Sequence, residues 1–334
     1  MVISKIEHNG FLYFDVHAEQ SYTGSFLADT GDANNNICEG IYGSELTAET
    51  LRNITDEVAL YKGKTIILDF SKIKDVQSNL FNTLIEIKEH SELLVLTEVS
   101  AHIVKKCNLG IFDQNKPGEG GNFESFVLSR NIQYITLKDT NELFYEHFST
   151  LLVDCTITNE GEDAFRHNSP VYVPKFIDIK GMMTNDSNFY LYILYRLALS
   201  IKEKFAEDGS GAQPILFCQN LNGAYNAAIL SRFLNYDLLS MDHIGPVNKV
   251  YSSIGNKIKE EARYIVISDV VCLGTEIKIC QNIINYSGGR YIGNASIVKI
   301  ETLKKEHQDN DSVSVFKITK ENNPIEFKIV TALA

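Results

Sequence analysis

An α/β fold in two domains is predicted for this chain, and three observations lead to it. Short apolar runs alternate with segments of helical periodicity along most of the sequence, which is typical of strands covered by helices. The 334 residues are enough for two domains that each bury a core. Residues 153–170, rich in Asn, Glu, Asp, Ser and Thr, predict a linker. We therefore expect one α/β domain over 1–152 and a second, with a mainly parallel sheet flanked by helices, over 171–334.

Strands and helices alternate in the first half of the sequence. Helix-period patterns follow the strands, and Ser100 and Asp139 stand where they can cap the second and third helices. Residues 28–40 and 113–122 predict loops, because Asn and Gly recur in them. Whether strands before residue 60 belong to the same sheet is left open. The predicted strands are 64–70, 93–97 and 132–137.

Two stretches of this half carry a family resemblance. They read Leu-Asp-Phe-Ser-Lys-Ile-Lys-Asp-Val-Gln-Ser at 68–78 and Cys-Asn-Leu-Gly-Ile-Phe at 107–112. Together with the order of elements, they make residues 60–150 resemble a STAS domain, the fold of anti-sigma-factor antagonists and of the cytoplasmic tails of anion transporters. The resemblance implies a protein partner and a phosphorylation site at Ser78, where a helix begins. The alternative role of Ser78 is an ordinary N-cap.

The second half predicts a parallel sheet. The apolar runs within 214–220 and 264–268 are short and continuous, as in strands that are buried on both faces. A helical pattern follows each of them. Residues 291–300 predict another strand, and 312–330 alternates well enough for two closing strands on either side of a turn at 321–324.

The most informative stretch is 264–282. An apolar strand meets Asp269, a short turn carries Gly274 and Thr275, and a helix follows. Ligands bind at such strand ends in α/β sheets, because loop amides and a helix N-terminus can hold an anion while a carboxylate takes sugar hydroxyls. The stretch resembles the phosphoribosyl-pyrophosphate (PRPP) loop of type I phosphoribosyltransferases, and the resemblance covers about 165–334. The ribose- and phosphate-binding residues that it implies are Ser268, Asp269, Cys272, Leu273, Gly274, Thr275 and Glu276.

This loop departs from the family pattern. Ser268 stands where the family has the first of two adjacent acids, and Asp269 matches the second. Without a gap, Glu276 takes the place of the closing hydroxyl beside the phosphate; with a one-residue deletion, Thr275 would supply that hydroxyl. Glu276 also suits the first turn of its own helix, and Asp269 could serve as a strand-end turn former. We expect these departures to weaken turnover.

The family's pyrophosphate loop matches a strand-to-helix connection here. Active members often carry a basic residue in it, whereas Asn222 can donate hydrogen bonds but adds no positive charge. A simple turn is the alternative, since Asn-x-Asn-Gly is good turn chemistry. The four matching residues are Asn220, Leu221, Asn222 and Gly223.

The hood of the family matches the segment around 171–186, which comes before a long apolar helix. Two basic residues in it, Lys175 and Lys180, are candidates to compensate for the missing charge. A nucleobase-like acceptor would stack in the hood, where the candidates are Tyr172, Phe176 and Met182.

Composition excludes several partner classes. The net charge of −12 opposes binding to nucleic acid or to an anionic membrane, and no apolar run reaches spanning length. The six cysteines show no Cys-x-x-Cys spacing, and the chain does not start like a signal peptide, so we expect a reduced, cytoplasmic protein. The histidines show no metal-binding spacing, so no dedicated metal site is expected, although Mg²⁺ could enter with a pyrophosphate ligand.

Three classes of function remain after the sequence analysis. The first is a phosphoribosyltransferase-like protein that binds PRPP or a nucleotide and regulates, with weak turnover or none. The second is an active transferase that displaces pyrophosphate from PRPP with a nucleobase-like acceptor. The third is a STAS-type protein–protein scaffold without a small-molecule ligand. Homo-oligomerisation is open in all three.

Overall fold

The computed structural model describes residues 2–18, 45–77, 80–109, 113–115, 125–128, 138–158, 171–205, 213–219, 221–241, 257–301 and 311–331. They form two compact units, Met1–His147 and Phe148–Ala334, and the division falls inside helix α5 (Thr140–Asp154). The predicted linker over 153–170 includes the end of α5 and strand β9 (Thr156–Thr158), and 159–170 lie outside the described residues. The chain therefore has a mixed α/β fold with parallel strands in both units.

The first unit is built on a six-stranded sheet in the order β1-β2-β4-β6-β8-β7. Strands β2, β4 and β6 run parallel at its centre, while β1, β8 and β7 pair antiparallel at the two edges. The strands are β1 (Lys5–His8), β2 (Phe11–Asp15), β4 (Thr65–Asp69), β6 (Leu93–Thr97), β7 (Asp113–Asn115) and β8 (Ser125–Leu128). The question left open by the sequence is thus answered, because β1 and β2 belong to this sheet.

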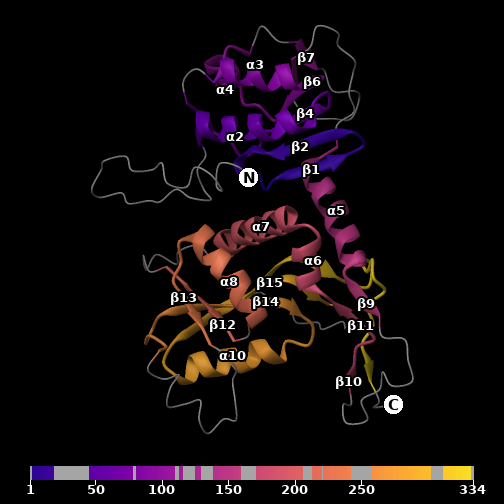
Figure 1. Ribbon diagram of the computed structural model, residues 1–334. Helices are drawn as coiled ribbons and strands as arrows, with labels where there is room; N and C mark the ends of the chain where they lie inside the picture. The colour runs from indigo at the N-terminus through magenta and orange to yellow at the C-terminus, as the bar shows by residue number, and fades with distance from the viewer. Residues whose placement is uncertain are drawn as a thin grey trace. The chain divides into compact units, whose positions relative to one another are not determined.

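Helices pack on this sheet through apolar faces (Figure 1). Alternate residues of the central strands, such as Phe14, Leu68 and Leu96, share a core with the buried faces of α2, α3 and α4. The side chain of Thr47 caps α2, and that of Ser100 caps α4 as predicted. The remaining elements are α2 (Ala48–Val58), the 3-10 helix η2 (Ala59–Tyr61), α3 (Phe81–His90), α4 (Ala101–Lys106) and the strand pair β3 (Glu45–Leu46) and β5 (Asp75–Val76).

Two expectations for this unit need correction. The segment 113–122 was expected to be a loop, but it begins with β7, which pairs with β8 at the edge of the sheet. Backbone pairing forms this strand, and its sequence Asp-Gln-Asn has no apolar alternation to reveal it. Strand β8 was not expected at all. The strand predicted at 132–137 lies outside the described residues.

The second unit is built on a five-stranded, all-parallel sheet in the order β13-β12-β14-β15-β16. Strand β14 is central, and its residues 263–268 are buried without interruption, as the sequence predicted. The strands are β12 (Ile215–Cys218), β13 (Leu238–Ser240), β14 (Arg263–Val271), β15 (Arg290–Ile300) and β16 (Ser312–Ile318).

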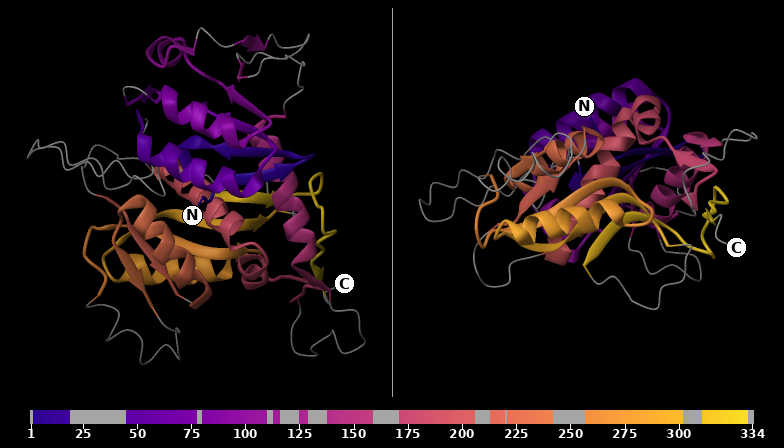
Figure 2. Two further views of the ribbon diagram at one scale, coloured as in Figure 1. Left: turned by 45° about the horizontal axis from the view of Figure 1, so that its top comes forward. Right: turned by 90° about the horizontal axis from the view of Figure 1, so that it is seen from below.

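Helices cover both faces of this sheet. Helices α7 (Ser187–Phe205) and α8 (Leu221–Leu234) lie side by side on one face, and α10 (Thr275–Tyr286) lies on the other (Figures 1 and 2). Tyr264 and Val266 of β14 pack with Ile277 and Cys280 of α10, so Ile265 and Ile267 point to the opposite face of the sheet, on which α7 and α8 lie. A buried sheet between helix layers is the expected setting for an all-parallel arrangement.

Smaller elements complete the second unit. Asp178 caps α6 (Ile179–Asn185), and β11 (Lys175–Ile177) pairs with β9. The second closing strand expected within 312–330 does not join the main sheet. Within the described residues after β16, the one strand is β17 (Val330–Thr331). It pairs with β10 (Val171–Tyr172), because the turn that begins at Thr319 leads the chain away from the sheet.

Candidate ligand-binding site

The candidate site lies at the carboxyl ends of the adjacent parallel strands β12 and β14. In strand β14, Asp269 is half-buried after six buried residues, and its Oδ1 atom accepts a hydrogen bond of 2.8 Å from the amide of Val270. Ligands of α/β proteins bind at this edge of a sheet. Asp269 is therefore placed where a carboxylate can reach the hydroxyls of a bound sugar.

Ser268 and Asp269 lie on opposite faces of β14. Ser268 is buried, on the same face as Tyr264 and Val266, beneath α10. Asp269 is on the face covered by α7 and α8. The position that carries an acid in the phosphoribosyltransferase pattern is thus a serine directed into the core, and Asp269 alone remains at the open end of the strand.

The loop after β14 runs from Cys272 to Gly274 and leads directly into α10. Leu273 is 44% exposed, and Thr275 and Glu276 are exposed as well. Gly274 has φ +70°, a left-handed conformation, and no side chain caps the helix at this position. Backbone amides at an uncapped helix start can receive an anion. Glu276 lies in this first turn, where it also complements the helix dipole.

Helices α7 and α8 bring two further residues to this region. The hydroxyl of Tyr190 on α7 donates a hydrogen bond of 2.5 Å to Oδ1 of Asn226 on α8, and both side chains are buried. Burial raises the pKa of Tyr190, and the negative charge of Asp269 raises this pKa further, which places the carboxylate near the phenol. The sequence analysis missed both residues, because each occupies an ordinary core position in a helix pattern.

The predicted pyrophosphate loop is shorter than its four residues suggest. Strand β12 ends at Cys218 and α8 begins at Leu221, so Leu221, Asn222 and Gly223 form the first turn of the helix. Asn220 and the side chain of Asn222 lie outside the described residues.

The hood residues lie in β11 and α6. The ammonium of Lys175 donates a hydrogen bond of 2.6 Å to the carbonyl oxygen of Ile325, whereas Lys180 is exposed. Phe176 is 61% exposed and Met182 is buried, so of these two residues Phe176 can offer a ring face. The side chain of Tyr172 lies outside the described residues.

The phosphorylation site predicted at Ser78 in the first unit lies outside the described residues. Its neighbour Asp75 accepts hydrogen bonds from Lys106 (2.7 Å) and His102 (3.1 Å) of α4. The hydrogen bond from Lys106, together with those from the amide of Val76 and from His102, lowers the pKa of Asp75 to about 2. Asp75 therefore anchors α4 as a carboxylate.

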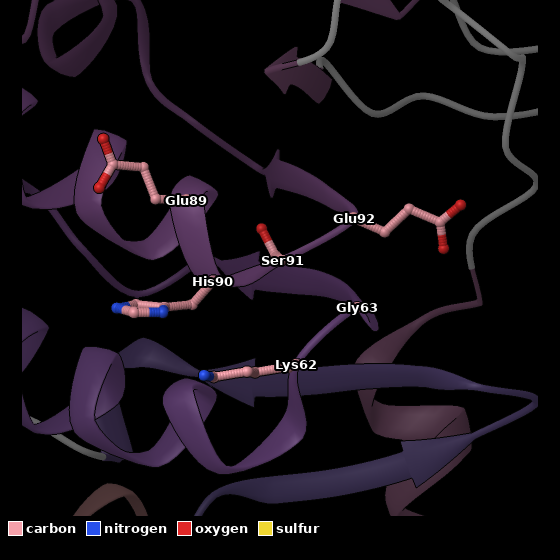
Figure 3. A pocket seen from close by; sticks show the side chains of 6 residues that line it. All are labelled: Lys62, Gly63, Glu89, His90, Ser91 and Glu92. Carbon is pink, nitrogen blue, oxygen red and sulfur yellow. The ribbon is translucent and has the colours of Figure 1, made fainter.

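A cavity of about 500 Å³ in the first unit is formed by two turns (Figure 3). The turn at Lys62 and Gly63 precedes β4, and the turn from His90 to Glu92 precedes β6, so both lie at the amino ends of parallel strands. The two turns are joined by a 3.4 Å bond from the amide of Gly63 to the carbonyl of His90. Ligands favour the opposite end of such sheets, and this cavity is not the candidate site.

The described part of the chain was also compared with what a metal site and a membrane span require. No group of three or more His, Cys, Asp or Glu side chains is placed there to hold a metal ion. None of the described helices combines the length and the hydropathy that a membrane span requires.

The solved structures that are similar to this chain include phosphoribosyltransferases, at low similarity. No family model and no curated protein matches the chain. Adenine phosphoribosyltransferase from Thermoanaerobacter pseudethanolicus is a similar solved structure, with a TM-score of 0.39 and 14% identity over 52% of this chain and 99% of that one. Orotate phosphoribosyltransferase from Aeropyrum pernix has a TM-score of 0.37 and 14% identity over 51% and 93%. These low values leave the function to be inferred from the residues themselves.

Proposed function

We propose that the second unit binds a phosphorylated ribose, PRPP or a nucleotide, at the carboxyl ends of β12 and β14, and that it does so for regulation, with little transfer chemistry. The observation that carries this proposal is the position of Asp269. Its carboxylate stands at the open end of the central strand, three residues before an exposed loop that starts a helix with uncapped amides. The carboxylate can accept hydrogen bonds from sugar hydroxyls, and the uncapped amides can donate to a phosphate.

The same site is poor in the groups that transfer would need. Displacement of pyrophosphate places negative charge on the leaving group, and Asn222 supplies no positive charge to it. Ser268 is directed into the core, and Glu276 would stand beside the phosphate of the ribose. Lys175, one of the two basic hood residues, is bonded to a backbone carbonyl. Binding therefore suits the site better than catalysis.

Mg²⁺ fits this proposal only as a companion of the ligand. The ion is usually held by one or two carboxylates together with phosphate oxygens, and Asp269 is the carboxylate at this strand end. It would reduce the repulsion between a pyrophosphate group and the acidic chain.

Titration calorimetry with PRPP and Mg²⁺ tests the proposal. The wild-type chain should bind, and Asp269→Ala should weaken binding by roughly ten-fold to a hundred-fold, since a hydrogen bond to a charged group contributes about 1.5–3 kcal/mol. Asp237→Ala is the matched control, because Asp237 is a 73% exposed acid of the same unit that pairs with Lys259. Absence of binding by PRPP and by nucleotides would reject the proposal in favour of a protein–protein scaffold.

For the first unit, the STAS resemblance and the protein partner that it implies stay a prediction. A regulatory pairing of a ligand-binding unit with a partner-binding unit is consistent with the two compact units of the chain. Capture of one defined partner by the wild-type chain, and its loss in Ser78→Glu, would support this role.

A further inference from the structure

We propose that Asn226 is an additional ligand-binding residue of this site, with its side-chain amide donating to an oxygen of the phosphate or sugar and the hydroxyl of Tyr190 holding it in place. This inference rests on the proposed function. It adds to the site a residue that lies outside the loop after β14 and outside the connection between β12 and α8.

The amide of Asn226 has an unused donor group. Its side chain is 1% exposed, and its Oδ1 atom accepts the 2.5 Å hydrogen bond from Tyr190. Its Nδ2 atom is buried and makes no hydrogen bond within the described part of the chain. An amide nitrogen carries two donors, and a buried donor without a partner is unfavourable. Such a group calls for an explanation, and a bound ligand that accepts the hydrogen bond is one.

Both possible orientations of the side-chain amide of Asn226 leave one of its polar atoms without a partner. If the oxygen and nitrogen were exchanged, Nδ2 would face the hydroxyl of Tyr190 and the oxygen would lose its donor. One end of Asn226 is without a protein partner in either case. The orientation observed leaves a donor, which is what the oxygens of an anion or a sugar require.

Asn226 lies on α8, the helix that packs on β14, the strand of Asp269. It is in the second turn of α8, the helix that begins just after the carboxyl end of β12. Tyr190, its partner, is close enough to Asp269 for the carboxylate to affect its pKa. Helix α8 packs on β14, and α7 lies beside α8 over the neighbouring strands β15 and β16 (Figure 1). The donor group and the carboxylate therefore border the same region.

The variants must separate a ligand contact from a purely structural hydrogen bond. Asn226→Leu alone leaves the hydroxyl of Tyr190 buried without an acceptor and is expected to destabilise the fold. The double variant Tyr190→Phe/Asn226→Leu removes both partners, which is often close to neutral for stability. Asn294→Leu is the matched control. Asn294 is a 3% exposed asparagine that donates a 3.0 Å hydrogen bond to the hydroxyl of Tyr291, and its Oδ1 atom has no hydrogen-bond partner within the described residues. It lies in the amino-terminal half of β15, away from the strand ends that form the site.

Calorimetry of the full chain with PRPP and Mg²⁺ is the decisive measurement. The double variant should bind at least ten-fold more weakly than the wild type, whereas folded Asn294→Leu should keep its affinity within about two-fold. Inorganic pyrophosphate and ribose 5-phosphate, used as separate probes, show which part of the ligand receives the donor: the affected probe should lose affinity in the double variant.

A second measurement needs no folded variant. In the wild-type chain labelled with ¹⁵N-asparagine, the side-chain amide signals of Asn226 should shift when PRPP is added, and those of Asn294 should not. Unchanged Asn226 signals and an unchanged affinity of the double variant, with PRPP still bound in an Asp269-dependent way, would overturn the role of Asn226 and leave the proposed function intact. If the wild type binds none of the three probes, the proposed function itself fails.

Discussion

Acidic residues lie near strand ends in both units. Asp269 could be proposed as a site residue from the sequence because a family pattern surrounds it. In the first unit, Asp15 and Asp69 end the adjacent strands β2 and β4, and burial raises the pKa of Asp69 while Asp15 adds to the effect. The sequence analysis assigned no role to Asp15, because one acid after an apolar run is also common in turns. Only the parallel register brings the two carboxyl groups to one edge.

His17, beside these acids, should make the stability of the chain depend on pH. Burial lowers its pKa from 6.5 to about 4, against the opposing charge of Asp15. The unfolded chain then binds more protons than the folded chain between pH 6.5 and 4, so the free energy of unfolding falls as the pH falls through this window. One pKa unit corresponds to about 1.4 kcal/mol, so the full window amounts to roughly 3 kcal/mol.

Urea unfolding at several pH values checks this prediction. His17→Asn should lose less stability than the wild type between pH 6.5 and 4, whereas His102→Asn, at a 62% exposed position, should follow the wild type. The raised pKa values of Asp69 and Glu98 act in the opposite direction, because the folded chain binds their protons more tightly. The difference between His17→Asn and wild type isolates the histidine. Parallel curves for the two would contradict the assignment.

Elements with apolar runs were predictable, and those formed by backbone pairing alone were not. β6 and β14 have continuous apolar sequences and were placed correctly, as was the helix α10 with its buried face. β7 consists of polar residues and depends on its partner strand. The strand and the loop that carry the candidate site could be predicted from the sequence, and their role in binding stays a prediction. Asn226 could not, because its contact with Tyr190 joins two helices distant in sequence.

The contact between α7 and β15 depends on Gly293. A Cβ atom at this position would lie 2.4 Å from the carbonyl oxygen of Asp311 and 2.4 Å from Cε1 of Phe205, the last residue of α7. Gly293→Ala should therefore destabilise the chain by about 3 kcal/mol, at the upper end for overpacking. Gly274→Ala has open space around its Cβ and should cost only about 1–2 kcal/mol of left-handed strain. Denaturant unfolding measures the free energy of unfolding of both variants. Equal decreases would show that Phe205 can move aside at little cost.

At the scale of the whole molecule, the fold and the chemistry have separate requirements. A parallel sheet between two helix layers needs buried apolar strands, and the second unit has them. Pyrophosphate displacement needs in addition a charged leaving-group site and fixed ribose hydroxyls. The chain can lack the groups for pyrophosphate displacement and still keep the fold, because Ser268 and Asn222 are compatible with the strand and the helix that contain them. The proposed function, binding with little transfer, is consistent with this separation.

Little turnover is therefore the last prediction. Removal of one preorganised donor alone typically slows a reaction by about 10²–10³, and the neutral Asn222, the inward Ser268 and the acidic Glu276 each weaken the site. Pyrophosphate release from PRPP and Mg²⁺ should stay at background with adenine, guanine, hypoxanthine, uracil, cytosine and orotate, under conditions where calorimetry detects PRPP binding. Base-dependent release that disappears in Asp269→Asn would instead establish a transferase. In that case Lys180, the exposed hood cation, would be the first residue to replace in search of the missing charge.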